Sequence, residues 1–150
     1  MTGKAQEFPW ELDYLPKLPQ NRDMGIGCIG AGFIMADCHL VSYKKAGLQP
    51  VAIASQNMEN AKQVGNRHQI PLVYENYHKL LIDPQVEILD IAVPPDVQLD
   101  VVRKAVEHND HIRGILAQKP LGMNLAEARE IVKLCDEAGI ALAVNQNMRY

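Results

Sequence analysis

The chain has 150 residues, of which 47% are hydrophobic and 22% are charged, and its formal net charge is −3. This length and balance are typical of one soluble globular domain with a sizeable core. The weak negative charge gives no electrostatic footprint for nucleic acid or for an anionic membrane, so neither is expected as a partner. The longest apolar runs have the length of strands, too short to span a bilayer.

The cysteines and the first residues predict the compartment. Cys28, Cys38 and Cys135 form no C-x-x-C pair, and an odd count at these spacings is a poor framework for disulfides or zinc. All three fall within apolar patterns, so each is predicted to be a buried small hydrophobic residue. Residues 1–20 show no basic start followed by an apolar run, so we expect no signal peptide and a cytoplasmic protein.

Strands and helices are predicted to alternate from residue 23 to residue 150. Residues 1–22 have three prolines and no period, which indicates an irregular N-terminal arm or a disordered leader. Six short apolar runs are predicted as strands, at 25–29, 51–54, 72–74, 88–93, 115–117 and 141–144. Between them lie five stretches with helical spacing, from the glycines to Ala46 and at 58–68, 76–82, 97–108 and 124–139.

Two of these helices carry clear end signals. Asn124 and Glu127 form a capping pair, and Gly139 suits the position just past the last turn. The core face of this helix is predicted from its spacing as Leu125, Ala128, Val132 and Cys135. In the helix before it, Asp96 is predicted as the N-cap, with a buried side made of Leu99, Val102 and Val106.

This alternation predicts an α/β fold. Strands joined by right-handed helical crossovers must pair in parallel, with helices on both faces of the sheet. Six strands and five helices make a complete doubly wound parallel sheet, the Rossmann dinucleotide-binding fold, with the expected strand order 3-2-1-4-5-6.

Two overlapping glycine signatures compete at the first strand. Gly25, Gly27 and Gly30 match G-x-G-x-x-G, but the polar residues before them cannot form the strand that the signature must follow. Gly30 and Gly32 lie at the turn after the apolar run, so this second register is favoured. The loop of this register is Gly30–Ile34, which includes Phe33. Its backbone amides lie at a helix N-terminus and would bind a diphosphate. Met35 stands where a third glycine would allow close packing, and it is expected to push the helix away or to point elsewhere.

The end of the second strand bears on the choice of cofactor. Sites for NAD usually place an acidic residue there to bind the ribose 2′-hydroxyl, but this chain has Ser55. Ser55, Gln56 and Asn57 can donate hydrogen bonds to a 2′-phosphate, although no arginine stands nearby. The sequence therefore favours NADP slightly over NAD. These residues also fit a plain loop and a helix cap.

Several segments together resemble a known family. "AVPPDVQ" at 92–98, "AQKPLGMNLAEA" at 117–128 and "GIALAVNQNMRY" at 139–150, with His39 after the glycine turn, are similar to the N-terminal domain of the glucose–fructose oxidoreductase, inositol 2-dehydrogenase and MocA family (Gfo/Idh/MocA). The resemblance covers residues 24–150. It implies an NAD(P)-dependent dehydrogenase that transfers a hydride between the nicotinamide and a sugar, polyol or related hydroxyl compound.

The resemblance also implies site residues. Val93, Pro94 and Pro95 would line the nicotinamide side of the cofactor, with Gln98 in place of the family's histidine. Gln118-Lys119-Pro120 matches the family's E-K-P, so Lys119 would be the catalytic lysine beside the reacting hydroxyl, although an exposed strand-end lysine is the plain alternative. Gln118 in place of glutamate removes a charge that would orient Lys119.

In the family a second domain follows and supplies most of the substrate pocket, an acid/base Asp–His pair and the oligomer interface. The chain ends at Tyr150, where that domain would begin, so we expect it to lack the domain, as a fragment of a longer enzyme rather than as a stand-alone nucleotide module. The 150 residues alone are expected to bind cofactor without turnover, and the full-length form is expected to be a homo-oligomer. A non-catalytic nucleotide-binding regulator on the same scaffold is the alternative, and elimination or glycoside cleavage assisted by the cofactor is a third reading.

Other constellations indicate no further chemistry. His108 and His111 have H-x-x-H spacing but run from a helix end into a loop, so no metal site is predicted. Asp90, inside the fourth strand, is predicted to be a structural polar residue with a partner rather than a catalyst.

Overall fold

The computed structural model describes residues 17–146. Its six strands form one parallel sheet in the order β3-β2-β1-β4-β5-β6, which confirms the predicted fold class and strand order. The predicted arm lies mostly outside the described residues, and residues 17–22 form no helix or strand. The strands are β1 Gly25–Ile29, β2 Gln49–Ala54, β3 Leu72–Tyr74, β4 Ile88–Ile91, β5 Gly114–Gln118 and β6 Ala141–Asn145.

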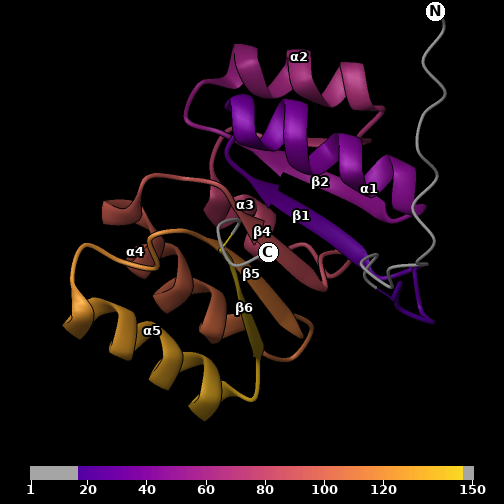
Figure 1. Ribbon diagram of the computed structural model, residues 1–150. Coiled ribbons are helices and arrows are strands. Elements are labelled where there is room, and N and C mark those ends of the chain that lie inside the picture. The colour runs from indigo at the N-terminus through magenta and orange to yellow at the C-terminus, as the bar shows by residue number, and fades with distance from the viewer. Residues whose placement is uncertain (1–16, 147–150) are drawn as a thin grey trace, which may run out of the picture.

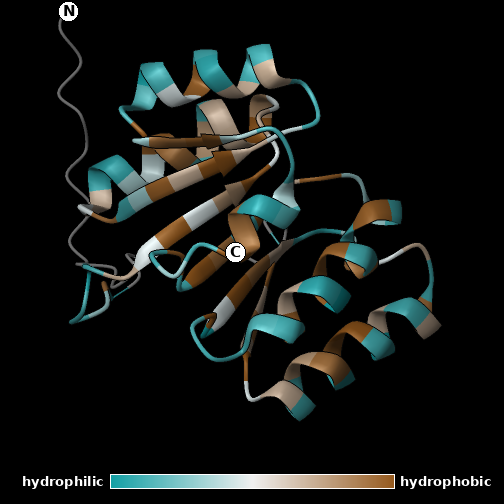
Figure 2. Ribbon diagram, turned by 180° about the vertical axis from the view of Figure 1, so that it is seen from behind, coloured by the Kyte–Doolittle hydropathy of each residue, from teal (hydrophilic) through white to brown (hydrophobic). Residues whose placement is uncertain are grey.

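Helices cover the sheet in two groups. The helical elements are η1 Ile34–His39, α1 Leu40–Ala46, α2 Met58–His68, α3 Tyr77–Leu81, α4 Pro95–Ala105, η2 Val106–His108 and α5 Leu125–Ala138. Figure 1 shows α1 and α2 together beside β1 and β2, with α4 and α5 on the opposite side beside β5 and β6. The strands are largely apolar and the helices show apolar and polar sides, as Figure 2 shows.

Each face of the sheet has its own core. One cluster packs β1 and β2 against η1, α1 and α2, and includes Cys28, Met35 and Ile53. The other packs β4 and β5 against α3, α4 and α5, and includes Leu89 and Ile131. The chain therefore leaves β1 toward one face and β4 toward the other. In a doubly wound sheet, such a reversal opens a crevice at the carboxyl ends of the two strands.

The helix that follows β4 starts earlier than predicted. Pro94 is the N-cap and Pro95 the first helical residue, so the expectation that Asp96 caps this helix is wrong. Proline suits the first helical position because its φ is already helical and it has no N–H to satisfy. The strand before it ends at Ile91 rather than at residue 93, so Ala92 and Val93 lie in the loop between them.

Two predicted core faces need correction. In α5 the cap of Asn124 on the Glu127 amide (3.0 Å) and the left-handed Gly139 are confirmed, but Leu125 is 65% and Val132 is 43% exposed. The buried side chains are Ile131 and, as predicted, Cys135. The helix therefore packs Ile131 against the sheet and leaves its neighbour Val132 toward solvent. In α4 and in η2 directly after it, Val102 is buried as predicted, whereas Leu99 and Val106 are half-buried beside fully buried Val101 and Ala105.

The cysteines differ in exposure. All three are free thiols, and Cys28 and Cys135 are buried as predicted. Cys38 is exposed, contrary to the prediction, because η1 buries Met35, Ala36 and His39 on one side and leaves Cys38 on the other. Burial raises the pKa of the Cys135 thiol to about 11, and burial with the nearby Asp90 raises the pKa of Cys28.

Candidate functional site

The glycine turn after β1 follows the second of the two registers. Gly30 has φ +105°, and a Cβ there would lie 2.4 Å from the carbonyl oxygen of Ala92. Its amide donates to the carbonyl of Ala54 at 2.8 Å. Gly30 is thus clamped between the ends of β2 and β4, where only glycine fits. Gly32, by contrast, is exposed, and a Cβ there would meet nothing within 4 Å.

The two glycines of the rejected register have a packing role inside β1. A Cβ on Gly25 would lie 1.9 Å from the carbonyl oxygen of Gln85. A Cβ on Gly27 would lie 2.6 Å from Val86 and 2.8 Å from Leu80. These glycines allow the segment before β4 to cross β1 closely. Their match to the nucleotide signature is therefore a consequence of core packing.

The helix after the turn begins with a π-helical segment, η1, which continues into α1. Met35, in place of the third glycine, is fully buried within the β1–β2 core rather than pointing elsewhere. The wider π-helical turn coincides with this large side chain, and such turns occur often at functional sites. The first turn leaves backbone amides without intrahelical partners, and these amides face the glycine turn.

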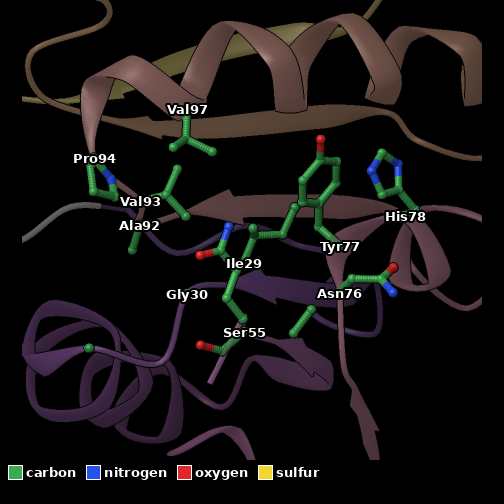
Figure 3. A pocket seen from close by; sticks show the side chains of 13 residues that line it. Ile29, Gly30, Ser55, Asn76, Tyr77, His78, Ala92, Val93, Pro94 and Val97 are labelled. Carbon is green, nitrogen blue, oxygen red and sulfur yellow. The ribbon is translucent and has the colours of Figure 1, made fainter. Parts of the chain in front are cut away.

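A cavity of about 480 Å³ opens at this turn, at the carboxyl ends of β1, β2 and β4. In Figure 3, Val93 and Val97 border it on one side and Ser55 and Asn76 on another, with Gly30 between. Its lining is mainly apolar, with a few polar groups, as is usual for small-molecule sites. The lining residues are Ile29, Gly30, Gly32, Ala54, Ser55, Gln56, Asn76, Tyr77, His78, Ala92, Val93, Pro94 and Val97.

The residues after β2 divide between the cavity and the next helix. Ser55 and Gln56 line the cavity. The Asn57 side chain instead accepts from the amide of Asn60 at 3.1 Å and caps α2. The Ser55 hydroxyl accepts from the Asn57 amide at 3.3 Å, which leaves its own proton free to donate into the cavity.

Sequence reasoning missed the wall that follows β3. Asn76, Tyr77 and His78 line the first cavity from the start of α3. The Tyr77 hydroxyl donates to the Asp100 carboxylate on α4, and in Figure 3 its ring lies between α3 and α4. Partial burial, with this hydrogen bond, raises the pKa of Tyr77 to about 12. The sequence did offer a signal for Asn76, Tyr77 and His78, because they follow the carboxyl end of β3 and the crevice of this fold lies at the carboxyl ends of the strands.

A second cavity of about 720 Å³ adjoins the first, and Val93 and Pro94 line both. Lys119 at the end of β5 is exposed within it, and its amide donates to Oε1 of Gln118 at 2.9 Å. Lys119 is the only Lys, Arg, Asp or Glu among the described residues that line this cavity. It forms no salt bridge among residues 17–146. The lining residues are Ile34, Cys38, His39, Ser42, Tyr43, Val93, Pro94, Pro95, Leu116, Gln118, Lys119 and Asn145.

Two of the predicted cofactor-binding side chains line neither cavity. Gln98 is fully buried, and its Nε2 donates to the carbonyl of Pro120 at 2.7 Å. It therefore braces the loop that follows Lys119, across a cis Lys119–Pro120 peptide bond. Phe33 is 70% exposed at the start of the helix, so its backbone rather than its ring belongs to the turn.

Asp90 is the centre of a buried hydrogen-bond network. Its Oδ2 accepts from the Tyr43 hydroxyl at 2.6 Å and lies 2.7 Å from Nδ1 of His39. Nε2 of His39 lies 2.8 Å from Nδ2 of Asn145 at the end of β6. Burial, with the neighbouring Asp90, raises the pKa of Tyr43, so its hydroxyl remains a donor. The predicted partner for Asp90 is present, but the sequence did not reveal that the network reaches the second cavity.

Metal and membrane features are lacking in the part of the chain that the structure describes. No three His, Cys, Asp or Glu side chains between residues 17 and 146 come together as a metal site. Nε2 of His111 is instead 2.9 Å from the Leu81 carbonyl. None of the described helices is long and apolar enough to cross a membrane.

Comparison with known proteins identifies the fold and then the family. An all-parallel sheet in this order, with a glycine turn at the switch point, defines a Rossmann-type nucleotide-binding domain. Residues 24–146 match the Gfo/Idh/MocA model, described as "Oxidoreductase family, NAD-binding Rossmann fold". The chain belongs to this oxidoreductase family, as its motifs indicate, and forms the family's NAD-binding domain.

The similar proteins are longer than this chain. The chain is 31% identical over 131 residues to an uncharacterized protein of Saccharomyces cerevisiae, covering 85% of this chain and 37% of that protein. It is 30% identical over 118 residues to the trans-1,2-dihydrobenzene-1,2-diol dehydrogenase of Sus scrofa, covering 77% and 34%. An oxidoreductase from Agrobacterium radiobacter, solved with NAD+, L-tartaric acid and magnesium, superposes with a TM-score of 0.78 at 26% identity, covering 85% and 36%. The chain thus spans about a third of the length of these relatives.

Proposed function

We propose that this domain binds NAD(P) with the diphosphate on the Gly30–Ile34 turn. The observation that carries the proposal is the clamped Gly30 followed by the open Gly32, at the mouth of a cavity on the carboxyl edge of the sheet. The backbone can approach a ligand closely there because no side chain intervenes, and the first-turn amides supply donors for an anion. The residues present therefore fit a dinucleotide.

The two cavities suit the two halves of that cofactor. The first, with Ser55 and Gln56 after β2, would hold the adenosine half. Neither side chain carries a negative charge to repel a 2′-phosphate, and both can donate to one, which favours NADP slightly over NAD. The second cavity, with Val93, Pro94 and Pro95 at its border, would take the nicotinamide half and the substrate.

Lys119 is the candidate catalytic residue. When bound, the nicotinamide supplies or accepts the hydride. The Lys119 ammonium has no carboxylate partner among residues 17–146, and Lys119 lines the second cavity, where its ammonium can hydrogen-bond a substrate oxygen as charge develops on it. Gln98 would hold this lysine indirectly, because it anchors the Pro120 carbonyl next in the chain.

The substrate class follows from these groups and from the family. A sugar, a polyol or a related hydroxyl compound offers a carbinol carbon for hydride transfer and hydroxyls for the polar lining. Relatives with named activities, such as the dihydrodiol dehydrogenase, are dehydrogenases, which supports this function over a non-catalytic regulator. Turnover by the full-length protein would use a further domain, through which we also expect homo-oligomers.

The cellular setting is part of the proposal. The three free cysteines are consistent with a reducing compartment, which favours the cytoplasm. The net charge of −3 offers nothing to attract nucleic acid, so the expected partner is a small molecule.

The diphosphate site is tested by charge at Gly32. We expect Gly32→Asp to fold normally, because a Cβ there meets nothing within 4 Å. A carboxylate about 4 Å from the diphosphate opposes binding by about 1 kcal/mol or more, so the NADPH affinity of Gly32→Asp should be at least about fivefold weaker than that of Gly32→Asn. Gly32→Asn, the neutral isostere, is the matched control and should lose less.

Titration of NADPH and of NADH into each variant, followed by nicotinamide fluorescence, gives the affinities. Equal loss in the Asp and Asn variants would contradict the charge argument. No change in nicotinamide fluorescence when the unmodified chain is titrated with either nucleotide would overturn the proposal itself.

A further inference from the structure

We propose that Asn145 is a specificity residue that recognises a hydroxyl group of the substrate, with Asp90 and His39 as positioning residues that fix the orientation of its amide. The inference rests on the proposed function, because it concerns the substrate side of the same site. It is carried by the three-residue hydrogen-bond chain that runs from inside the sheet to the wall of the second cavity.

The direction of the hydrogen bonds is set at Asp90. Its Oδ2 accepts from the Tyr43 hydroxyl at 2.6 Å, and Nδ1 of His39 lies 2.7 Å from the same oxygen. Nδ1 must therefore carry a proton, and the Nε2 of a neutral imidazole is then an acceptor. Asn145 lies 2.8 Å from Nε2, so it must offer its NH2 group there. Its Oδ1 is the atom left for a ligand.

Burial protects the direction of these hydrogen bonds. Asp90 is 1% and His39 is 8% exposed, so water has little access to exchange with either hydrogen bond. The pair also joins β4 to the helical segment after the glycine turn, and Asn145 extends the link to β6. The Asn145 amide is thus held in one orientation by Asp90 acting through His39.

The acceptor that results lines the same cavity as a donor. Asn145 pairs with Gln118 in the β5–β6 register, and Lys119 follows Gln118 directly. Asn145 and Lys119 both line the second cavity. An ammonium only donates, and Asn145 Oδ1 only accepts. A hydroxyl can satisfy both at once, whereas a deoxy carbon satisfies neither and a carboxylate has no proton for Oδ1. The site therefore selects alcohols over their deoxy analogues.

The tautomer is tested without any ligand. In the chain labelled with ¹⁵N, we expect His39 to be protonated at Nδ1 and unprotonated at Nε2 at neutral pH, read from the ring nitrogen shifts. The Asp90→Leu variant offers Nδ1 no acceptor, so the preference for a proton on Nδ1 should be lost. A wild-type His39 with a proton on Nε2 would overturn the inference.

Ligand selection is tested with xylitol and pentane-1,5-diol, which has the same carbon number without secondary hydroxyls. With NADP+ saturating, the wild-type chain should bind xylitol more tightly. Asn145→Leu and Asp90→Leu should each weaken xylitol binding by about three- to tenfold, the equivalent of one net hydrogen bond. Lys133→Ala, on the exposed side of α5, lines neither cavity and is the control that should leave xylitol affinity unchanged.

The two proposals fail differently. Equal binding of the two probes, or an unchanged xylitol affinity in Asn145→Leu, would refute the role of Asn145 while NADPH binding persists. A chain that binds no NADPH refutes the proposed function, and the His39 tautomer is read independently of that result. Circular dichroism of each variant shows that it is folded before binding is compared.

Discussion

Alanine at Gly27 and at Gly32 should separate folding from cofactor binding. At Gly27 the new methyl group would lie 2.6 Å from Val86 and 2.8 Å from Leu80, both fully buried. Overpacking of this kind costs about 1–3 kcal/mol. For a chain of this size, each kcal/mol lowers Tm by about 2–4 °C, so Gly27→Ala should melt about 2–12 °C lower. At temperatures where it is folded, its NADPH affinity should equal that of the wild type.

Gly32→Ala should behave in the opposite way. A Cβ there meets no atom within 4 Å, so stability should change by less than about 0.5 kcal/mol. The methyl group stands where the diphosphate approaches, and we expect NADPH affinity to fall about tenfold. Thermal melts by circular dichroism and nucleotide titrations below the melting range measure the two effects. Weakened NADPH binding in Gly27→Ala at an unchanged Tm would refute the choice of register.

Three further predictions concern residues around the site. Iodoacetamide at pH 8 should label Cys38 alone in the native chain, because Cys38 is exposed while burial raises the pKa of Cys28 and Cys135; mass spectrometry showing a second modified thiol would contradict this. Asn57→Ala should lower the free energy of unfolding by about 1 kcal/mol in urea, since the cap on the Asn60 amide is lost, whereas Gln56→Ala should leave it unchanged. Ser55→Asp should shift cofactor preference toward NADH by at least about fivefold, because a carboxylate near a 2′-phosphate costs about 1 kcal/mol or more; equal losses for both nucleotides would place Ser55 away from the ribose.

The fold could be predicted because local signals agree along this chain. Apolar runs mark all six strands, and Asn124 and Gly139 mark the ends of a helix at the residues where the structure has them. The choice between glycine registers also needed only the rule that the turn must follow a strand. Such signals depend on neighbours within a few residues, which sequence reasoning handles well.

The errors arose where contacts with distant segments of the chain decide which side chains are buried. In α5 the predicted face was right at Cys135 but included Val132 in place of Ile131, because the two residues are equally apolar and only packing against the sheet selects Ile131. Gln98 was placed at the cofactor, yet the Pro120 carbonyl 22 residues away holds it in the interior. The link from Asp90 through His39 to Asn145 joins residues up to 106 positions apart, so no local pattern could reveal it.

The central claim is that backbone amides of the glycine turn hold the diphosphate of NAD(P). Amide chemical shifts of the ¹⁵N-labelled chain, followed during titration with NADPH, test it residue by residue. We predict saturable shifts that are largest at Gly32, Phe33 and Ile34, with smaller changes at Ser55 and Gln56. Saturable binding that leaves these three amides unshifted would contradict the account.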